Sequence, residues 1–165
     1  MTTDSFPRGD ALPAANTRVA ALERKLLSMP PVRALGIHVA RFEGNVLTLA
    51  APLSHNVNDK GSAFGGSLAS AMTLAAWGLA TLELQQAGFN ADVYVQDSTL
   101  RYLKPLYDDL RVEARIVPGQ DWTSFLASFA SRGKARCTLL ADAFDAQGNV
   151  VTSFEGRFVA LRPGN

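Results

Sequence analysis

The sequence predicts an α+β protein in which an antiparallel sheet wraps around one long central helix. Residues 61–82 contain no charged side chain, and a double glycine, Gly65-Gly66, stands where a helix would begin. The predicted elements follow in the order helix, two strands, long apolar helix, then four strands with a short helix among them. A sheet that encloses the central helix explains why that helix has no polar face.

Residues 61–82 are also long enough to cross a bilayer. They consist mainly of Ala, Gly, Ser and Thr, with few of the large apolar residues that drive membrane insertion. No basic cluster or aromatic belt flanks them, and the segments that follow have the pattern of ordinary strands. We therefore predict a buried helix from about residue 66 to about residue 86, and no membrane span.

Length and composition fit one domain. A chain of 165 residues that is 47% hydrophobic can bury a core without disulfides. The single cysteine, Cys137, cannot pair within the chain, and the first residues lack the pattern of a signal peptide, so we expect a cytoplasmic protein. Sixteen basic and fifteen acidic residues nearly cancel, which predicts no general attraction to nucleic acid or acidic membranes.

The first half of the chain is expected to begin with a flexible arm, residues 1–15, ahead of a single domain over residues 16–165. Asn16 or Thr17 can cap a first helix, which the Pro30-Pro31 pair ends. Two strands that form a hairpin follow, over residues 36–42 and 46–51.

In the second half, the central helix is expected to end by Gly88. Strands are predicted from residue 92 to Pro105 and over residues 110–117, 135–144 and 150–161. A short extra helix is predicted near residues 122–130, behind a cap at Asp121 or Thr123. In the strand from residue 92, alternation places Val93, Val95, Asp97, Thr99 and Arg101 on one face.

Two motifs within residues 56–105 resemble motifs of hot-dog thioesterases. Residues 58–66 read Asn-Asp-Lys-Gly-Ser-Ala-Phe-Gly-Gly, which is similar to the signature Asn-x-x-Gly-x-x-His-Gly-Gly. Residues 101–105 read Arg-Tyr-Leu-Lys-Pro, similar to the Tyr-x-x-Pro strand end of these enzymes. Phe64 in place of the signature histidine, with Phe-Gly-Gly-Ser-Leu and Ala-Trp-Gly, resembles more narrowly the thioesterase family defined by the YiiD C-terminal domain.

The resemblance spans about residues 30–162 and implies the hot-dog fold. It also implies an acyl thioesterase that hydrolyses acyl-CoA or acyl-carrier-protein thioesters at a site between two subunits of a homodimer or a tetramer. The alternative is a non-catalytic module that binds acyl thioesters or regulates their use. A lyase that hydrates enoyl thioesters is disfavoured, because the His and the Asp or Glu of that chemistry are not evident around Phe64 and Thr73.

The start of the central helix is the expected oxyanion site. Backbone N–H groups of Gly65, Gly66 and Ser67, together with the helix dipole, can bind a carbonyl oxygen that becomes anionic. Glycine also lets a ligand approach the backbone closely. The alternative is that both glycines only permit tight packing of the helix against the sheet.

Two polar residues match catalytic positions of the resembled family. Asn58 corresponds to the signature asparagine that helps to hold the carbonyl or the water; alternatively it forms an Asx turn in the loop. Thr73, seven residues after Gly66, stands where many relatives carry a catalytic Asp or Glu. It could orient water, or it could simply bond to its own helical turn.

The best remaining carboxylate is Asp97. In hot-dog dimers the strand that contains it pairs with its twin and faces the partner's helix start, so Asp97 could act as the base there. An acidic residue in mid-strand is against propensity, which favours a special role. The alternative is a structural ion pair across the dimer, with Arg101 as the suggested partner.

Substrate contacts are expected from Phe64, which with Met72 and Trp77 could line an acyl tunnel or simply pack in the core. Arg101 with Lys104, or the basic residues 132–136, could hold phosphates of coenzyme A or phosphopantetheine, although such residues are often only solvated. His38 and Cys137 have no partners at metal-ligand spacing, so we expect no metal and no cofactor. His55 is close in sequence to Asn58, but we expect it to be a solvated residue of the loop.

Overall fold

The structure is a computed structural model that describes residues 11–164. Its elements are α1 (Ala11–Ser28), α2 (Pro30–Leu35), β1 (His38–Glu43), β2 (Val46–Ala51), a 3₁₀ turn (Leu53–His55), α3 (Gly65–Gln86), β3 (Asp92–Tyr102), β4 (Leu110–Ile116), α4 (Trp122–Arg132), β5 (Lys134–Phe144) and β6 (Val150–Leu161).

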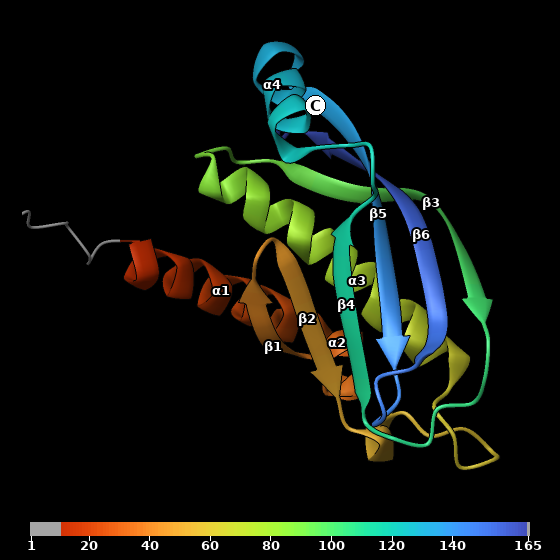
Figure 1. Cartoon of the computed structure of the whole chain (residues 1–165). Coiled ribbons are helices and arrows are strands. Elements are labelled where there is room, and N and C mark those ends of the chain that lie inside the picture. The colour runs from red at the N-terminus through yellow and green to blue at the C-terminus, as the bar shows by residue number, and fades with distance from the viewer. Residues whose placement is uncertain (1–10, 165) are drawn as a thin grey trace, which may run out of the picture.

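The six strands form one antiparallel sheet in the order β1-β2-β4-β5-β6-β3. Figure 1 shows this sheet curving around α3, which packs against every strand from β2 to β6. Helices α1 and α2 lie beside the β1–β2 hairpin, and α4 lies at the far end of the molecule, near the start of β3. The arrangement confirms the predicted α+β hot-dog architecture.

Helix α3 is the core of the fold. Of its 22 residues, 13 are buried, and they occupy all sides of the helix over its second half. A Cβ atom at Gly78 would lie 2.8 Å from Leu47 Cδ2 and 3.2 Å from Leu22 Cδ2, so β2 and α1 pack directly on the helix backbone there. By length and composition α3 could span a membrane, but 72% of its most apolar 18 residues is buried inside the fold.

The N-terminal region differs from the prediction in two places. Helix α1 begins at Ala11, before the expected cap at Asn16 or Thr17; residues 1–10 of the expected arm lie outside the described residues. Pro30 ends α1 but also begins a second helix, because proline suits the first turn, where its missing N–H is not needed. Gly36, with φ +70°, caps α2, and β1 therefore starts only at His38.

The short helix α4 is confirmed, with its cap at Asp121. The Asp121 carboxylate accepts a hydrogen bond from the Ser124 N–H at 2.7 Å, and Gly133 ends the helix at φ +66°. The turn between β5 and β6 is also confirmed, and Asp145 Oδ1 accepts the N–H groups of Gln147 and Asn149.

Strand β3 contains an irregularity that the sequence pattern did not predict. The register with β6 shifts between Val95 and Asp97, so that Gln96 forms a bulge. Before the shift Val95 lies opposite Phe158, and after it Asp97 lies opposite Arg157. A bulge of one residue exchanges the two faces of the strand, which alters the position of every side chain after it.

Candidate active site

The N-terminus of α3 has no side-chain cap. Phe64 occupies the N-cap position, where a hydroxyl, amide or carboxylate side chain would normally accept a hydrogen bond. The N–H groups of Ser67 and Leu68 donate to the Phe64 carbonyl at 3.0 and 3.1 Å. Within residues 11–164, the N–H groups of Gly65 and Gly66 have no acceptor. Two donors at the positive end of the helix dipole are therefore available to an anionic oxygen.

Ser67 does not contribute to this pair of donors, contrary to the expectation. Its N–H is bonded to Phe64, and the residue is 2% exposed. The available amides are those of the two glycines alone. We refer to Phe64, Gly65 and Gly66 as the tip of α3.

Two aromatic rings flank the tip. Tyr102, at the end of β3, donates its hydroxyl to the Gly65 carbonyl at 3.0 Å. A Cβ atom at Gly65 would lie 3.4 Å from the Tyr102 ring, and one at Gly66 would lie 2.5 Å from the Phe64 ring. Both rings are more than half exposed. A side chain at Gly66 would therefore require the Phe64 ring to move, whereas a Cβ at Gly65 would be in ordinary contact with the Tyr102 ring.

Other exposed apolar side chains lie on the two segments that meet at the tip. The Ala63 N–H donates to the Leu106 carbonyl at 2.7 Å, which joins the loop before α3 to the segment after β3. Together these segments expose Val57, Phe64, Tyr102, Leu103 and Tyr107. An exposed apolar group of this kind is typical of a surface that binds a ligand or a partner.

Asn58 orders the loop that leads to the tip. Its Oδ1 accepts the N–H groups of Lys60 and Ser62, at 2.8 and 3.1 Å, and its Nδ2 donates to the Ser62 hydroxyl at 2.9 Å. These are the bonds of the Asx turn that was the alternative reading of this residue. They leave only one Nδ2 hydrogen for a substrate.

Asn56 is a site residue that the sequence analysis missed. It is 2% exposed; its Nδ2 donates to the carbonyls of Leu35 and Pro52, and its own carbonyl accepts the Phe64 N–H at 2.7 Å. It therefore connects the end of α2 to the tip of α3. The Asn-x-Asn spacing was visible in the sequence, but only a structure shows which asparagine is buried.

Thr73 lies on the partly open face of α3, which we define as Gly66, Ala69, Ser70, Thr73, Leu74 and Trp77. Among the described residues its hydroxyl has no hydrogen-bond partner, whereas Ser70 and Thr81 bond back to their own helix. The expected alternative, a bond to its own turn, is therefore not found. Seven residues separate Thr73 from Gly66, about 10 Å along the axis, so the two do not meet in one subunit.

The structure does not bring Asp97 to the tip of α3. Arg157, which faces Asp97, lies between Gly156 and Phe158, whose buried positions are on the α3 side of the sheet. Asp97 is therefore on the opposite, outer face, where its Oδ2 accepts a hydrogen bond from Arg157 Nε at 2.8 Å. This hydrogen bond, with the Arg157 charge, lowers the pKa of Asp97.

The bulge explains why Asp97 is on the outer face. Without it, Asp97 would have followed Val93 and Val95 toward α3, as the alternation predicted. Instead Ser98, opposite the buried Gly156, is the polar residue on the α3 side. Within the chain, Asp97 pairs with Arg157 and not with Arg101, and an ion pair across a dimer stays a prediction.

Arg101 also lies on the outer face of the sheet. It pairs in register with Ser153 and shares a hollow with Thr99, Arg115 and Glu155. It is thus separated from the tip of its own subunit by the strand itself. The other expected phosphate ligand, Lys104, forms an ion pair with Asp145 at 3.3 Å.

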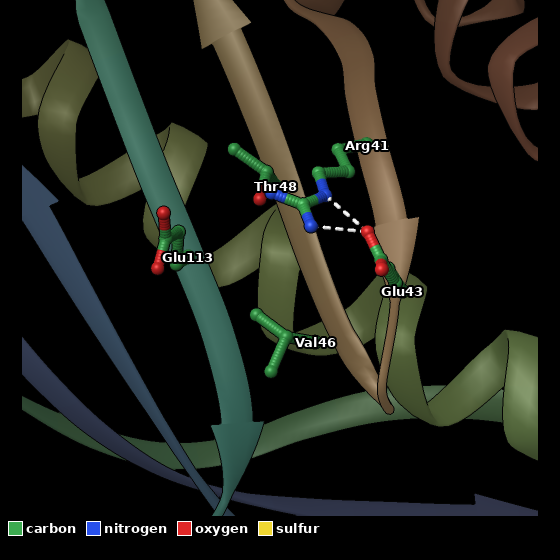
Figure 2. Close-up of a pocket in the computed structure, with 5 residues that line it drawn as sticks. All are labelled: Arg41, Glu43, Val46, Thr48 and Glu113. Carbon is green, nitrogen blue, oxygen red and sulfur yellow. Dashed lines mark hydrogen bonds and ion pairs between the residues drawn. The ribbon is translucent and has the colours of Figure 1, made fainter.

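A further hollow, of 220 Å³, lies at the other edge of the sheet. Figure 2 shows the residues that surround it: Arg41, Glu43, Val46, Thr48 and Glu113. Arg41 and Glu43 form an ion pair there. The buried Leu47 and Leu49 alternate with these side chains and face α3, so the sheet separates this hollow from the tip.

The remaining side chains do not favour catalysis by a nucleophilic side chain or by a bound metal ion. Burial raises the pKa of the Cys137 thiol to about 12, so a reactive thiolate is not formed at neutral pH. His55 is exposed in the loop before α3. Within the described part of the chain, no group of three or more His, Cys, Asp or Glu side chains is arranged to hold a metal ion.

Solved structures share this fold over nearly the whole chain. A protein of unknown function from Chlorobaculum tepidum is 26% identical, with a TM-score of 0.83 and coverage of 90% of this chain and 96% of that one. A putative thioesterase from Shewanella oneidensis is 28% identical, with a TM-score of 0.79 and coverage of 88% and 99%. A thioesterase from Haemophilus influenzae, at 14% identity and a TM-score of 0.71 over 89% and 92%, shows the fold alone.

The family comparison agrees with these structures and with the motifs around the tip. A family described as "Putative thioesterase (yiiD_Cterm)" matches residues 19–162, which include α3, the whole sheet and α4. The match covers both motifs of the sequence, the glycine pair and the end of β3. The chain therefore belongs to the YiiD C-terminal-domain thioesterase family.

Proposed function

We propose that the protein is an acyl thioesterase that hydrolyses acyl-CoA or acyl-carrier-protein thioesters. The observation that carries this proposal is the uncapped tip of α3, where two glycine N–H groups are unpaired between two exposed aromatic rings. A thioester carbonyl can approach a glycine backbone closely, and its oxygen gains negative charge during hydrolysis.

In the proposed reaction, water adds to the thioester carbonyl carbon and the carbonyl oxygen becomes an oxyanion. The N–H groups of Gly65 and Gly66 stabilise that charge. The oxyanion then collapses, the carbon–sulfur bond breaks, and the proton lost by the water ends on the departing sulfur. The products are a carboxylic acid and a free thiol.

We place the working site between two subunits. Within residues 11–164, strand β3 pairs with β6 alone and its other edge is open over 11 residues, and an open edge of this length favours pairing with another strand. Tyr102 at the end of β3 contacts the tip directly. A second copy paired along β3 would therefore lie beside the tip and could complete the site.

A substrate panel tests the proposal. The purified protein is incubated with acyl-CoA and acyl-carrier-protein thioesters of increasing chain length, and free thiol is measured over time. We expect thiol release above background for at least one substrate, and a Gly66→Ala variant should lose about a hundredfold of that rate, since its Cβ displaces the Phe64 ring beside the two N–H donors. No release from any member of either series would overturn the proposal.

One observation favours the second candidate function, a non-catalytic module that binds acyl thioesters. The open face of α3 contains no carboxylate; Thr73 stands at the expected position, and the acid of this helix, Glu83, is buried in its last two turns. The same panel separates the two functions. Binding of non-hydrolysable acyl-CoA thioethers in calorimetry, without release of thiol from any thioester, would identify a binding module.

A further inference from the structure

A groove of about 360 Å³ lies between α2 and α3. Its wall is formed by Pro31, Val32 and Leu35 of α2, and its floor by Ala69, Thr73 and Leu74 of α3. This volume is within the usual range for small-molecule sites, roughly 300 to 1,000 Å³. The expected tunnel residues do not line it: Met72 is fully buried, and Trp77 donates its Nε1–H to the Val93 carbonyl.

The lining of the groove suits a hydrocarbon chain. None of its side chains is charged, and Ser70, at its edge, turns its hydroxyl to the Gly66 carbonyl at 2.8 Å. Thr73 supplies the one polar atom on the floor, and its methyl group is available beside its hydroxyl. Apart from the hydroxyls of Ser70 and Thr73, the side chains of the groove offer no hydrogen bonds to a charged or strongly polar ligand.

The groove continues from the tip of α3. Ser70 is one helical turn beyond Gly66, and Ala69 and Leu74 extend the same open face away from the tip. A ligand whose carbonyl is held at the tip would therefore direct its chain along this floor. Gly66 and Leu74 are about 12 Å apart along the helix axis, at 1.5 Å per residue. An extended chain advances about 1.2 Å per bond, so the path from the tip to the far end of the groove accommodates about ten carbons.

The wall of the groove is held in a defined position. Asn56 Nδ2 donates to the Leu35 carbonyl at 2.8 Å, and Arg33 Nη1 donates to the Leu27 carbonyl at 3.2 Å. Asn56 also accepts the Phe64 N–H, so one buried residue joins the groove wall to the tip. Because the wall is fixed relative to the oxyanion site, the groove can select substrates by the length of their acyl chain.

We infer that this groove binds the acyl chain of the substrate and makes the enzyme selective for medium-chain acyl groups, of about eight to ten carbons. The inference rests on the proposed thioesterase function and adds to it the substrate class and the residues that select it. Helix α2, which precedes the sheet in the chain, is thereby assigned a role in specificity.

The test fills the groove. In Ala69→Phe an aromatic ring takes the place of the acyl chain, and Ala69→Leu is a milder version should the larger residue disturb folding. The control is Gln86→Phe, which adds the same ring at the exposed end of the same helix. Specificity constants are measured for saturated acyl-CoA substrates from two to sixteen carbons.

For the wild type and Gln86→Phe we expect the specificity constant to rise at least about tenfold from four to ten carbons, as each buried methylene adds binding energy, and not to rise further beyond. Ala69→Phe should lose at least about tenfold on ten-carbon substrate and change little on two- and four-carbon substrates, with Ala69→Leu between. An Ala69→Phe profile that is parallel to the wild type would overturn the inference. So would an altered sedimentation coefficient with an unaltered profile, since the groove would then be a contact between copies.

A binding measurement separates failure of this inference from failure of the proposed function. Dissociation constants are determined by calorimetry for the thioethers decyl-CoA and butyl-CoA. Tighter binding of decyl-CoA that Ala69→Phe abolishes supports the groove even if no thioester is hydrolysed. Equal affinity of the two thioethers for the wild type overturns the groove, whatever the rate of hydrolysis.

Discussion

Glu83 is a buried acid that makes stability depend on pH. It is 6% exposed, its Oε1 has no hydrogen-bond partner within residues 11–164, and burial raises its pKa from 4.5 to about 7. Between these values the folded protein holds a proton that the unfolded chain releases. The free energy of unfolding should therefore fall as pH rises through this window, by about 3 kcal/mol in total, and this contribution should be constant below it and above it.

The variant Glu83→Gln should remove this contribution, because an amide stays neutral. The free energies of unfolding of wild type and variant are measured in urea at pH 5 and at pH 8. Compared with the wild type, the variant should gain stability between pH 5 and pH 8. Glu155→Gln, at an exposed position of β6, serves as the control. Identical pH dependence of wild type and Glu83→Gln would mean that Glu83 is not protonated in the folded state.

Asp97 leads to a prediction opposite to the one suggested by sequence. As a catalytic base its replacement by Asn would cost about a hundredfold or more in turnover. In the structure it lies on the outer face of the sheet, paired with Arg157. Pairing of two β3 strands edge to edge would keep it on that face, away from the helices of both subunits. Asp97→Asn should therefore change the specificity constant less than about threefold, whereas a large loss would restore Asp97 as the base.

At the scale of the element, the start of α3 lacks a stabilising cap, and this leaves its N–H groups accessible to a substrate. Phe64→Ser would supply the missing cap, and its hydroxyl would accept the Gly66 N–H. Relative to Phe64→Ala, which lacks the hydroxyl but loses the same ring, Phe64→Ser should unfold with about 1 kcal/mol more free energy. It should also hydrolyse thioesters at least about tenfold more slowly, because one oxyanion donor is occupied. Urea unfolding and thiol release measure the two effects, and equal activity of the two variants would exclude Gly66 as a donor.

The elements themselves could be predicted from sequence because their signals are local. The charge-free run and the Asp121 cap each depend on neighbours within a few residues, and both are confirmed, whereas the alternation predicted for β3 holds only as far as Val95. The bulge at Gln96 depends on how β3 is held against β6, so no pattern within β3 indicates it. The same applies to Ser67, since only the formed first turn of α3 shows that its N–H is already bonded.

The site was less predictable than the fold for the same reason. The glycine pair was recognised because a motif identifies it, and its donors are free because Phe64 cannot cap. The role of Asn56 depends in part on the Leu35 carbonyl, 21 residues away, and that of Asn58 on a turn. Asn56 and Asn58, two residues apart, thus differ in role because one of them has a partner that is distant in sequence.

For the whole molecule, the open edge of β3 predicts how two copies associate. The strand exposes Tyr94 and Val95, and in the part of the chain that the structure describes it has no second neighbour in the sheet. We expect a dimer in which two β3 strands pair antiparallel and the two tips lie at the interface. The other edge strand, β1, is shorter and has four exposed positions among its six.

Val95→Lys places a charge in the middle of the proposed interface and should shift the protein from dimer to monomer in sedimentation velocity, because a lysine on an edge strand opposes pairing. His38→Lys on β1 adds a lysine at the other edge and should remain dimeric. If the site is shared between subunits, the activity of Val95→Lys should fall with its dimer fraction and recover as protein concentration rises. A monomeric Val95→Lys with full specific activity would show that one subunit contains the whole site. A dimer that persists in Val95→Lys would place the interface elsewhere.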